Sequence, residues 1–173
     1  MSAVLAKSRL VAFLAVCAAI VTTAVAATTG WHGLSQSQRN SRILNRADDD
    51  LNQNVGMSCK EWVRRVVRNA SGGEVGIPSN QNDYTWNSHP YVYRCPQPYP
   101  ISWVQPGQII QMRWTNANGT STPHTAIVLS RTSTSMTWID SNWQGDEVVR
   151  THSMTYSHFN NRVGNNYNIY EIR

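Results

Sequence analysis

The spacing of apolar residues predicts two amphipathic helices followed by five β-strands. Residues 34–51 are mostly polar, with apolar residues at helical spacing. Residues 59–70 place a stripe of apolar residues on the face opposite three arginines. Ser58 and Glu61 form the capping-box pattern at the start of the second helix, and Ser71-Gly72-Gly73 ends it. Short apolar runs bounded by turn residues predict strands at about 108–114, 124–129, 135–139, 147–152 and 167–172. Helices that precede an antiparallel sheet indicate an α+β fold.

The first 26 residues differ from the rest of the chain and resemble a signal peptide. Lys7 and Arg9 precede an uncharged apolar run at residues 10–21, and Ala24-Val25-Ala26 matches the small-x-small cleavage pattern. We therefore expect cleavage after Ala26 and a secreted or cell-wall-associated product. The alternatives are a retained membrane anchor, for which the run is short, and a lipoprotein modified at Cys17, where Val16 fits the preceding position poorly.

Export changes the charge and the cysteine count. The full chain has 15 basic and 10 acidic residues and a net charge of +5; without Lys7 and Arg9 the charge is about +3. That suits an anionic surface such as a bacterial cell wall, but it is too small to indicate nucleic-acid binding. No later segment is apolar enough to cross a bilayer, so no stable membrane insertion is expected after cleavage. The mature chain keeps Cys59 and Cys95, which could form a disulfide in an oxidising compartment.

Cys59 is the first candidate for chemistry. With Ser58 as the N-cap, Cys59 is the first residue of its helix, close to unpaired backbone N–H groups and to the positive end of the helix dipole. Such surroundings stabilise a thiolate and lower the pKa of a cysteine. The position therefore favours a nucleophilic cysteine.

His124 is the candidate base. It opens an apolar strand, and the next strand, after a short link, ends in Asp140 and Asn142. Pairing centred on Thr132 sets His124 opposite Asp140, whereas pairing centred on Ser133 sets it opposite Asn142. All three residues share one face in either register, because they are separated by even steps. The pattern thus predicts a cysteine–histidine site with a carboxylate or an amide as the third member.

Four segments in order resemble the CHAP domains (cysteine, histidine-dependent amidohydrolases/peptidases) and the related NlpC-type domains. They are Gly56 to Val63 around the cysteine, Pro106-Gly107-Gln108-Ile109-Ile110, His124 to Val128, and Asp140-Ser141-Asn142-Trp143. Gln108 stands where the family commonly has Asp, and Asp140 where it usually has Glu; residues 76–103 match nothing in the family pattern. The resemblance covers roughly residues 51–173, after the predicted signal peptide (1–26) and a leader with one helix (27–50).

The resemblance implies a papain-like fold and cleavage of amide bonds in peptidoglycan stem or cross-bridge peptides through a thioester. It implies Cys59 as the nucleophile, His124 as the general base, Asp140 as its orienter and Asn142 as a supporting polar residue. Trp143 follows this pair and is expected to contact substrate. No cofactor is expected, and no metal, because His89, His152 and His158 have no metal-ligand spacing with the cysteines.

Two other functions remain open from the sequence. One is a secreted binding or structural module held by a Cys59–Cys95 disulfide, without catalysis. The other is an exported toxin-like peptidase, which would use the same residues on a partner protein. An inhibitor or immunity protein is conceivable for such an enzyme, and no residue pattern identifies one.

Overall fold

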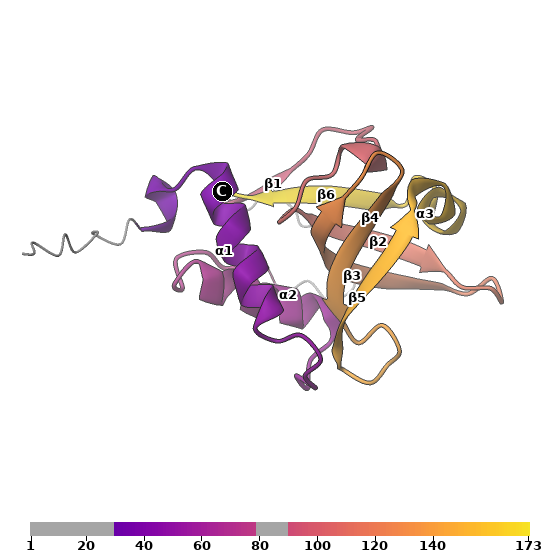
Figure 1. Ribbon diagram of the computed structural model, residues 1–173, viewed down its shortest axis with the longest axis horizontal. Coiled ribbons are helices and arrows are strands. Elements are labelled where there is room, and N and C mark those ends of the chain that lie inside the picture. Colours follow the sequence, from indigo (N-terminus) through magenta and orange to yellow (C-terminus); the bar gives the residue numbers. More distant parts are fainter. Residues whose placement is uncertain (1–29, 79–89) are drawn as a thin grey trace, which may run out of the picture.

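A computed structural model describes residues 30–78 and 90–173 of the chain. This part has an α+β fold, in which three α-helices pack against one six-stranded antiparallel sheet of order β1-β6-β2-β3-β4-β5 (Figure 1). The α+β prediction is therefore confirmed. The predicted signal peptide and His89 lie outside the described residues.

The predicted elements are present, and two further elements were not predicted. The helices are α1 (Gln36–Asp48), α2 (Cys59–Ala70) and α3 (Tyr156–Val163), with short 3₁₀ turns at Trp31–Gly33 and Ile101–Trp103. The strands are β1 (Val92–Arg94), β2 (Ile109–Thr115), β3 (Ser121–Arg131), β4 (Ser135–Ser141), β5 (Val149–Thr155) and β6 (Tyr167–Ile172). The additional elements are α3 and β1, and β1 lies within residues 76–103, which match nothing in the family pattern. Within the described residues, no helix has the length and apolar character needed to cross a membrane.

Helix α2 begins where the capping box predicts. The backbone N–H and the hydroxyl of Ser58 both approach the Glu61 carboxylate, at 3.4 and 2.9 Å. These contacts use polar groups that the first helical turn leaves without intrahelical partners. Cys59 is therefore fixed as the first residue of the helix.

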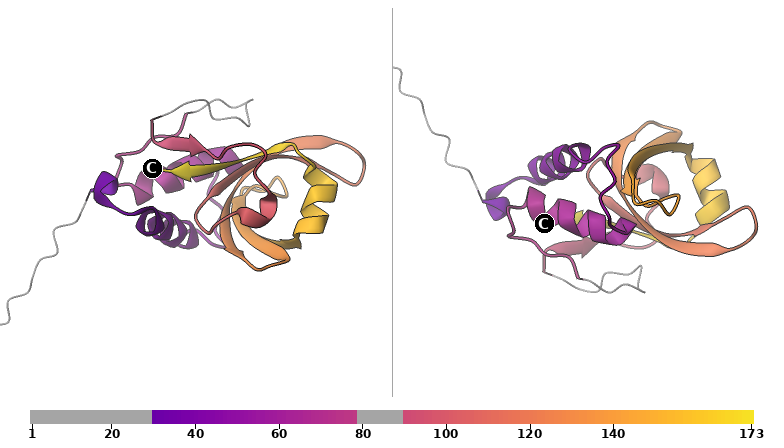
Figure 2. Two further views of the ribbon diagram at one scale, coloured as in Figure 1. Left: turned by 90° about the horizontal axis from the view of Figure 1, so that it is seen from above. Right: turned by 90° about the horizontal axis from the view of Figure 1, so that it is seen from below.

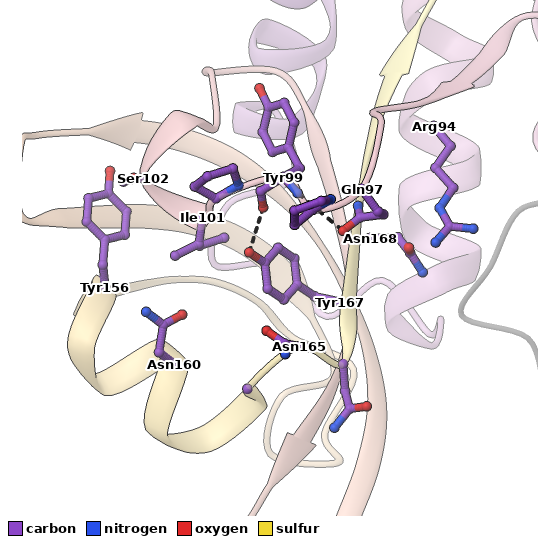
Figure 3. A pocket seen from close by; sticks show the side chains of 14 residues that line it. Arg94, Gln97, Tyr99, Ile101, Ser102, Tyr156, Asn160, Asn165, Tyr167 and Asn168 are labelled. Atoms are coloured by element: carbon purple, nitrogen blue, oxygen red, sulfur yellow. Dashed lines mark hydrogen bonds between the residues drawn. The ribbon is translucent and has the colours of Figure 1, made fainter.

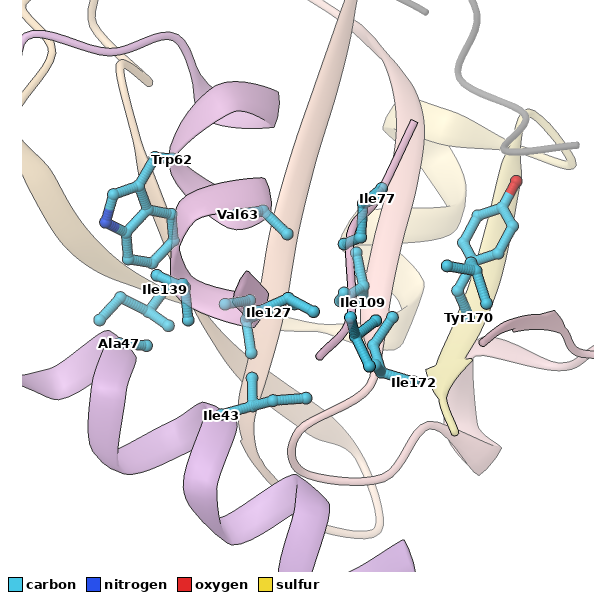
Figure 4. Packing of buried hydrophobic residues seen from close by; sticks show 14 of the residues in the cluster. Ile43, Ala47, Trp62, Val63, Ile77, Ile109, Ile127, Ile139, Tyr170 and Ile172 are labelled. Atoms are coloured by element: carbon cyan, nitrogen blue, oxygen red, sulfur yellow. The ribbon is translucent and has the colours of Figure 1, made fainter. Parts of the chain in front are cut away.

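The two faces of the sheet belong to two separate hydrophobic clusters. Ile109, Ile127 and Ile139 point toward α1 and α2, where they meet residues such as Ile43 and Trp62 (Figure 4). The alternate positions of the same strands point the other way and pack with α3; they include Ile110, Ala126, Val128 and Trp138. Figure 2 shows α1 and α2 toward one end of the molecule and α3 toward the other. Because side chains alternate along a strand, the even-numbered His124 and Asp140 share the face of the second cluster.

The turn at Pro106 and Gly107 joins α1 to the sheet. The Asn40 side chain donates a 2.8 Å hydrogen bond to the Pro106 carbonyl, and the Gly107 N–H donates to the Val128 carbonyl at 2.8 Å. Gly107 has φ +85°, and a Cβ placed on it would lie 2.5 Å from Cβ of Asn40. Glycine is required here both for its backbone conformation and for the close approach of the helix.

Candidate active site

Cys59 lies where the start of α2 meets the end of β4. The carbonyl of Met57, two residues before the cysteine, accepts a 3.0 Å hydrogen bond from the Ser141 hydroxyl. The Cys59 thiol is half-buried and contacts His124 and the backbone N–H of Thr125. The helix start is thus tied directly to the strand pair that carries the polar residues.

His124 and Asp140 come together from neighbouring strands. Nε2 of His124 lies 3.3 Å from Oδ2 of Asp140; the imidazole is 9% exposed and the carboxylate is fully buried. The two groups form an ion-pair contact rather than an aligned hydrogen bond. With Nε2 directed at the carboxylate, Nδ1 is the ring nitrogen left for the Cys59 sulfur.

The strand register does not place His124 directly opposite Asp140. Ile127 pairs with Ile139, which corresponds to the arrangement centred on Ser133, and a bulge follows between Val128 and Ser130. Continued along the strands, this register puts Asn142 opposite His124. Asp140 nevertheless reaches the imidazole, because it is two residues before Asn142 and therefore lies diagonally across from His124 on the same face of the sheet.

Asn142 is placed differently from its neighbours in the predicted site. Its backbone has φ +62°, which takes the chain out of β4. Its side-chain oxygen accepts a 3.1 Å hydrogen bond from the Glu147 N–H. The structure thus pairs Asn142 with the backbone of the β4–β5 loop and brings Cys59, His124 and Asp140 together.

The electrostatics of the three groups favour a thiolate beside an imidazolium. Burial alone would raise the pKa of Cys59, but contact with His124 and the charge of His124 outweigh burial and lower it. Burial likewise opposes protonation of His124, yet contacts with Asp140 and Cys59 raise its pKa to about 9. For Asp140, burial is outweighed by the two histidines near it, so its pKa is lowered.

Two residues that the sequence did not assign to the site hold Asp140. The Trp138 indole donates a 2.6 Å hydrogen bond to Oδ2, and Nε2 of His152 lies 3.6 Å from Oδ1. Trp138 and His152 face each other across β4 and β5. The sequence held two signals for these residues. Trp138 is separated from Asp140 by an even step along one strand, and His152 belongs to an alternating pattern on the next strand.

Trp143 packs against the candidate base. Its ring meets the His124 ring edge to face at 4.8 Å and 89°, and it lies 4.9 Å from the His152 ring. Its other ring neighbours are Trp114 and Trp138, at 5.0 and 5.7 Å. Trp143 is only half-buried, so part of it is exposed beside His124. Its expected contact with substrate stays a prediction.

Both cysteines of the described residues are free thiols, so no Cys59–Cys95 disulfide is present. Cys95 lies in the second cluster, and burial together with the charge of Glu171 raises its pKa to about 11. Within residues 30–78 and 90–173, no three His, Cys, Asp or Glu residues are grouped as metal ligands. The surroundings thus lower the pKa of Cys59 and raise the pKa of Cys95.

Comparisons with known proteins identify a shared fold. No protein-family model matches the chain, and no curated protein matches it. A crystal structure of Ly7917 with the hydrolyzing product of MDP has a TM-score of 0.52 at 16% identity, over 77% of this chain and 63% of that chain. A second crystal structure of Ly7917 has a TM-score of 0.52 at 17% identity, over 75% and 61%. This chain therefore spans about three fifths of the length of these structures, and at such identity the similarity is one of fold.

Proposed function

We propose that this chain is a cysteine amidohydrolase with a papain-like fold of the CHAP or NlpC type. The observation that carries the proposal is a thiol at a helix N-terminus, in contact with a histidine that a buried carboxylate holds from its other side. This is the arrangement that generates a nucleophilic thiolate near neutral pH. In this proposal Cys59 is the nucleophile, His124 the general acid and base, and Asp140 the residue that positions His124.

The reaction follows from the charges of these groups. The Cys59 thiolate attacks the carbonyl carbon of an amide, and the oxyanion that forms is stabilised by N–H groups at the start of α2. The His124 imidazolium gives its proton to the departing amine, which leaves a thioester on the sulfur. Neutral His124 then takes a proton from water as the water attacks the thioester; the carboxylic acid leaves, and the Cys59 thiolate and the His124 imidazolium are restored. Asp140 stays ionised throughout and stabilises the imidazolium.

The substrate we propose is the peptide part of peptidoglycan. MDP, which is named with the structural neighbour, is a peptidoglycan fragment. A groove of about 760 Å³ lies along α2 and is lined by Met57, Glu61 and three arginines, Arg64, Arg65 and Arg68. Met57 is two residues before Cys59, which does not itself line the groove. Arg65 is bonded to Asp50 and Arg64 to the Ile77 carbonyl, whereas Arg68 is exposed at the groove. Peptidoglycan peptides carry free carboxylates, which a guanidinium binds well.

An exported location belongs to the same proposal. The predicted signal peptide, residues 1–26, would deliver residues 27–173 to the compartment that contains cell wall. The resulting charge of about +3 favours approach to an anionic polymer.

Digestion of purified peptidoglycan by residues 27–173 tests the proposal. Mass spectrometry of the soluble products should show newly freed amines and carboxyls in the peptide part, and Cys59→Ala should release none. Cys95→Ala is the matched control, because it removes the other thiol and leaves the site intact. Equal digestion by Cys59→Ala, or loss of digestion in Cys95→Ala alone, would contradict the assignment.

A further inference from the structure

A second cavity lies away from the proposed catalytic residues. It has a volume of about 860 Å³, within the usual range of about 300–1,000 Å³ for ligand pockets. Its walls come from residues 97–102, from α3 and the loop after it, and from the start of β6 (Figure 3). None of Cys59, His124, Asp140 or Trp143 lines it.

Neutral carboxamides dominate the polar lining of this cavity. Asn160 comes from α3, Asn165 and Asn166 from the following loop, and Asn168 from β6. Gln97 uses its amide locally, accepting a hydrogen bond from the Tyr99 N–H at 3.3 Å. Among the described residues, the four asparagine side chains have no hydrogen-bond partner. Asn160, Asn165 and Asn166 are exposed, so each can offer two donors and an acceptor to a ligand, whereas Asn168 is only 3% exposed.

The apolar part of the wall combines tyrosine rings with Pro98, Pro100 and Ile101, and the tyrosine hydroxyls are engaged elsewhere. Tyr167 donates to the Tyr99 carbonyl at 2.6 Å, and Tyr156 donates to the Thr132 carbonyl at 3.1 Å. The Tyr99 hydroxyl donates to the Trp103 carbonyl at 3.2 Å. These bonds hold the rings in place, so the cavity offers fixed aromatic surface beside unpaired amides.

The charge of the residues that line the cavity restricts the kind of ligand that it can bind. Arg94 is the single charged residue among those that line it, and no acidic residue lines it. A strongly anionic ligand would find one cation, whereas a ligand rich in hydroxyl and acetamide groups would find several amides. Sugar rings combine such groups with C–H faces that pack on aromatic rings.

We propose that this cavity binds a neutral amino-sugar oligosaccharide, separately from the peptide at the catalytic residues. The choice of sugar rests on the proposed function, since the glycan of peptidoglycan is built of N-acetylated amino sugars. Cavity and catalytic site would then hold two parts of one polymer, with the glycan positioned while the peptide is cleaved.

Binding of the N-acetylglucosamine tetramer to the Cys59→Ala protein tests this proposal. Isothermal calorimetry gives the affinity, and ¹⁵N NMR identifies the residues whose signals move. The signals of Asn160, Asn165 and Tyr167 are expected to shift, while those of His124 and Asp140 stay unchanged. A double substitution, Asn160→Ala with Asn165→Ala, is expected to weaken binding about tenfold, because two hydrogen bonds are lost.

The adjacent residue provides the control. Asn161 is exposed on the same helix and does not line the cavity, so Asn161→Ala should bind the tetramer like the parent protein. No measurable binding, unchanged affinity in the double variant, or displacement of the sugar by a stem peptide without sugar would each overturn the proposal. Because the assay needs no hydrolysis, its failure leaves the amidase assignment standing. Equally, failed digestion of peptidoglycan leaves sugar binding to be judged by this measurement.

Discussion

Asp140→Asn is expected to lower the pKa of His124 without displacing the imidazole. The substitution keeps the size of the side chain and an oxygen that can accept the Trp138 hydrogen bond. It removes the negative charge, which lies 3.3 Å from Nε2 and is fully buried. A buried charge interacts strongly, because little water screens it.

The expected magnitude follows from the pKa of His124. The difference between about 9 and the ordinary 6.5 favours the imidazolium by about 3 kcal/mol, at about 1.4 kcal/mol for each pH unit. Burial opposes protonation, so the two negative partners, Asp140 and the Cys59 thiolate, together supply more than this net energy. Removing the Asp140 charge should therefore lower the pKa of His124 by roughly one unit or more.

Loss of the Asp140 charge affects the protonation of both His124 and Cys59. The raised pKa of His124 means that the imidazolium persists from acidic pH to about 9 and is lost above it. Without Asp140 this loss begins at lower pH. The charge of Asp140 also raises the pKa of Cys59 directly, but more weakly than His124 lowers it. The pH range of the thiolate–imidazolium pair should therefore shrink from its alkaline side.

The assay is ¹⁵N NMR titration of the histidine rings, with the His124 signals identified by their loss in His124→Ala. Asp146→Asn is the control, because Asp146 pairs with Arg150 of β5 and is not among the groups that shift the pKa of His124. An unchanged titration midpoint for His124 in Asp140→Asn, with the fold intact by circular dichroism, would refute the electrostatic role assigned to Asp140.

Three further predictions concern the thiols, a turn and a loop. Iodoacetamide at pH 6 should modify Cys59 and spare Cys95, whose pKa is about 11; peptide mass spectrometry measures both, and preferential labelling of Cys95 would contradict the two assignments. Gly107→Ala should lower the free energy of unfolding in urea by about 3 kcal/mol or more, through a clash with α1 and a positive φ, whereas Gly119→Ala, with open space around it, should cost about 1 kcal/mol. Asn142→Ala should cost about 1 kcal/mol of stability through the β4–β5 loop and leave the titration of His124 unchanged; a shifted midpoint would instead make Asn142 a partner of the histidine.

The parts of the fold that local rules govern could be predicted from the sequence. The capping box at Ser58 and Glu61 located the first residue of α2. The two-residue period of strands put His124 and Asp140 on one face, although the exact register stayed open. Both inferences need only neighbouring residues and the geometry of one element.

The remaining parts depend on contacts that are distant in sequence or on irregular backbone. Helix α3 has only three buried residues, and β1 has only three residues, which pair with the C-terminal strand. The left-handed backbone at Asn142 turns its side chain toward the loop, which strand alternation does not foresee. The sequence alone does not place His152 next to Asp140, because that contact depends on the register between β4 and β5.

The separation of the core into two clusters, each with its own cysteine environment, has a consequence for unfolding. The low pKa of Cys59 exists only while α2 is docked on the strands, and α2 belongs to the first cluster. Cys95 is shielded by the second cluster. Under gentle denaturant, pulse labelling of the two thiols thus reports separately on the two faces of the sheet. If the labelling rates of both thiols change at the same denaturant concentration, the two faces of the sheet unfold together. If the rate at Cys59 changes first, the helical layer is an independent cooperative unit.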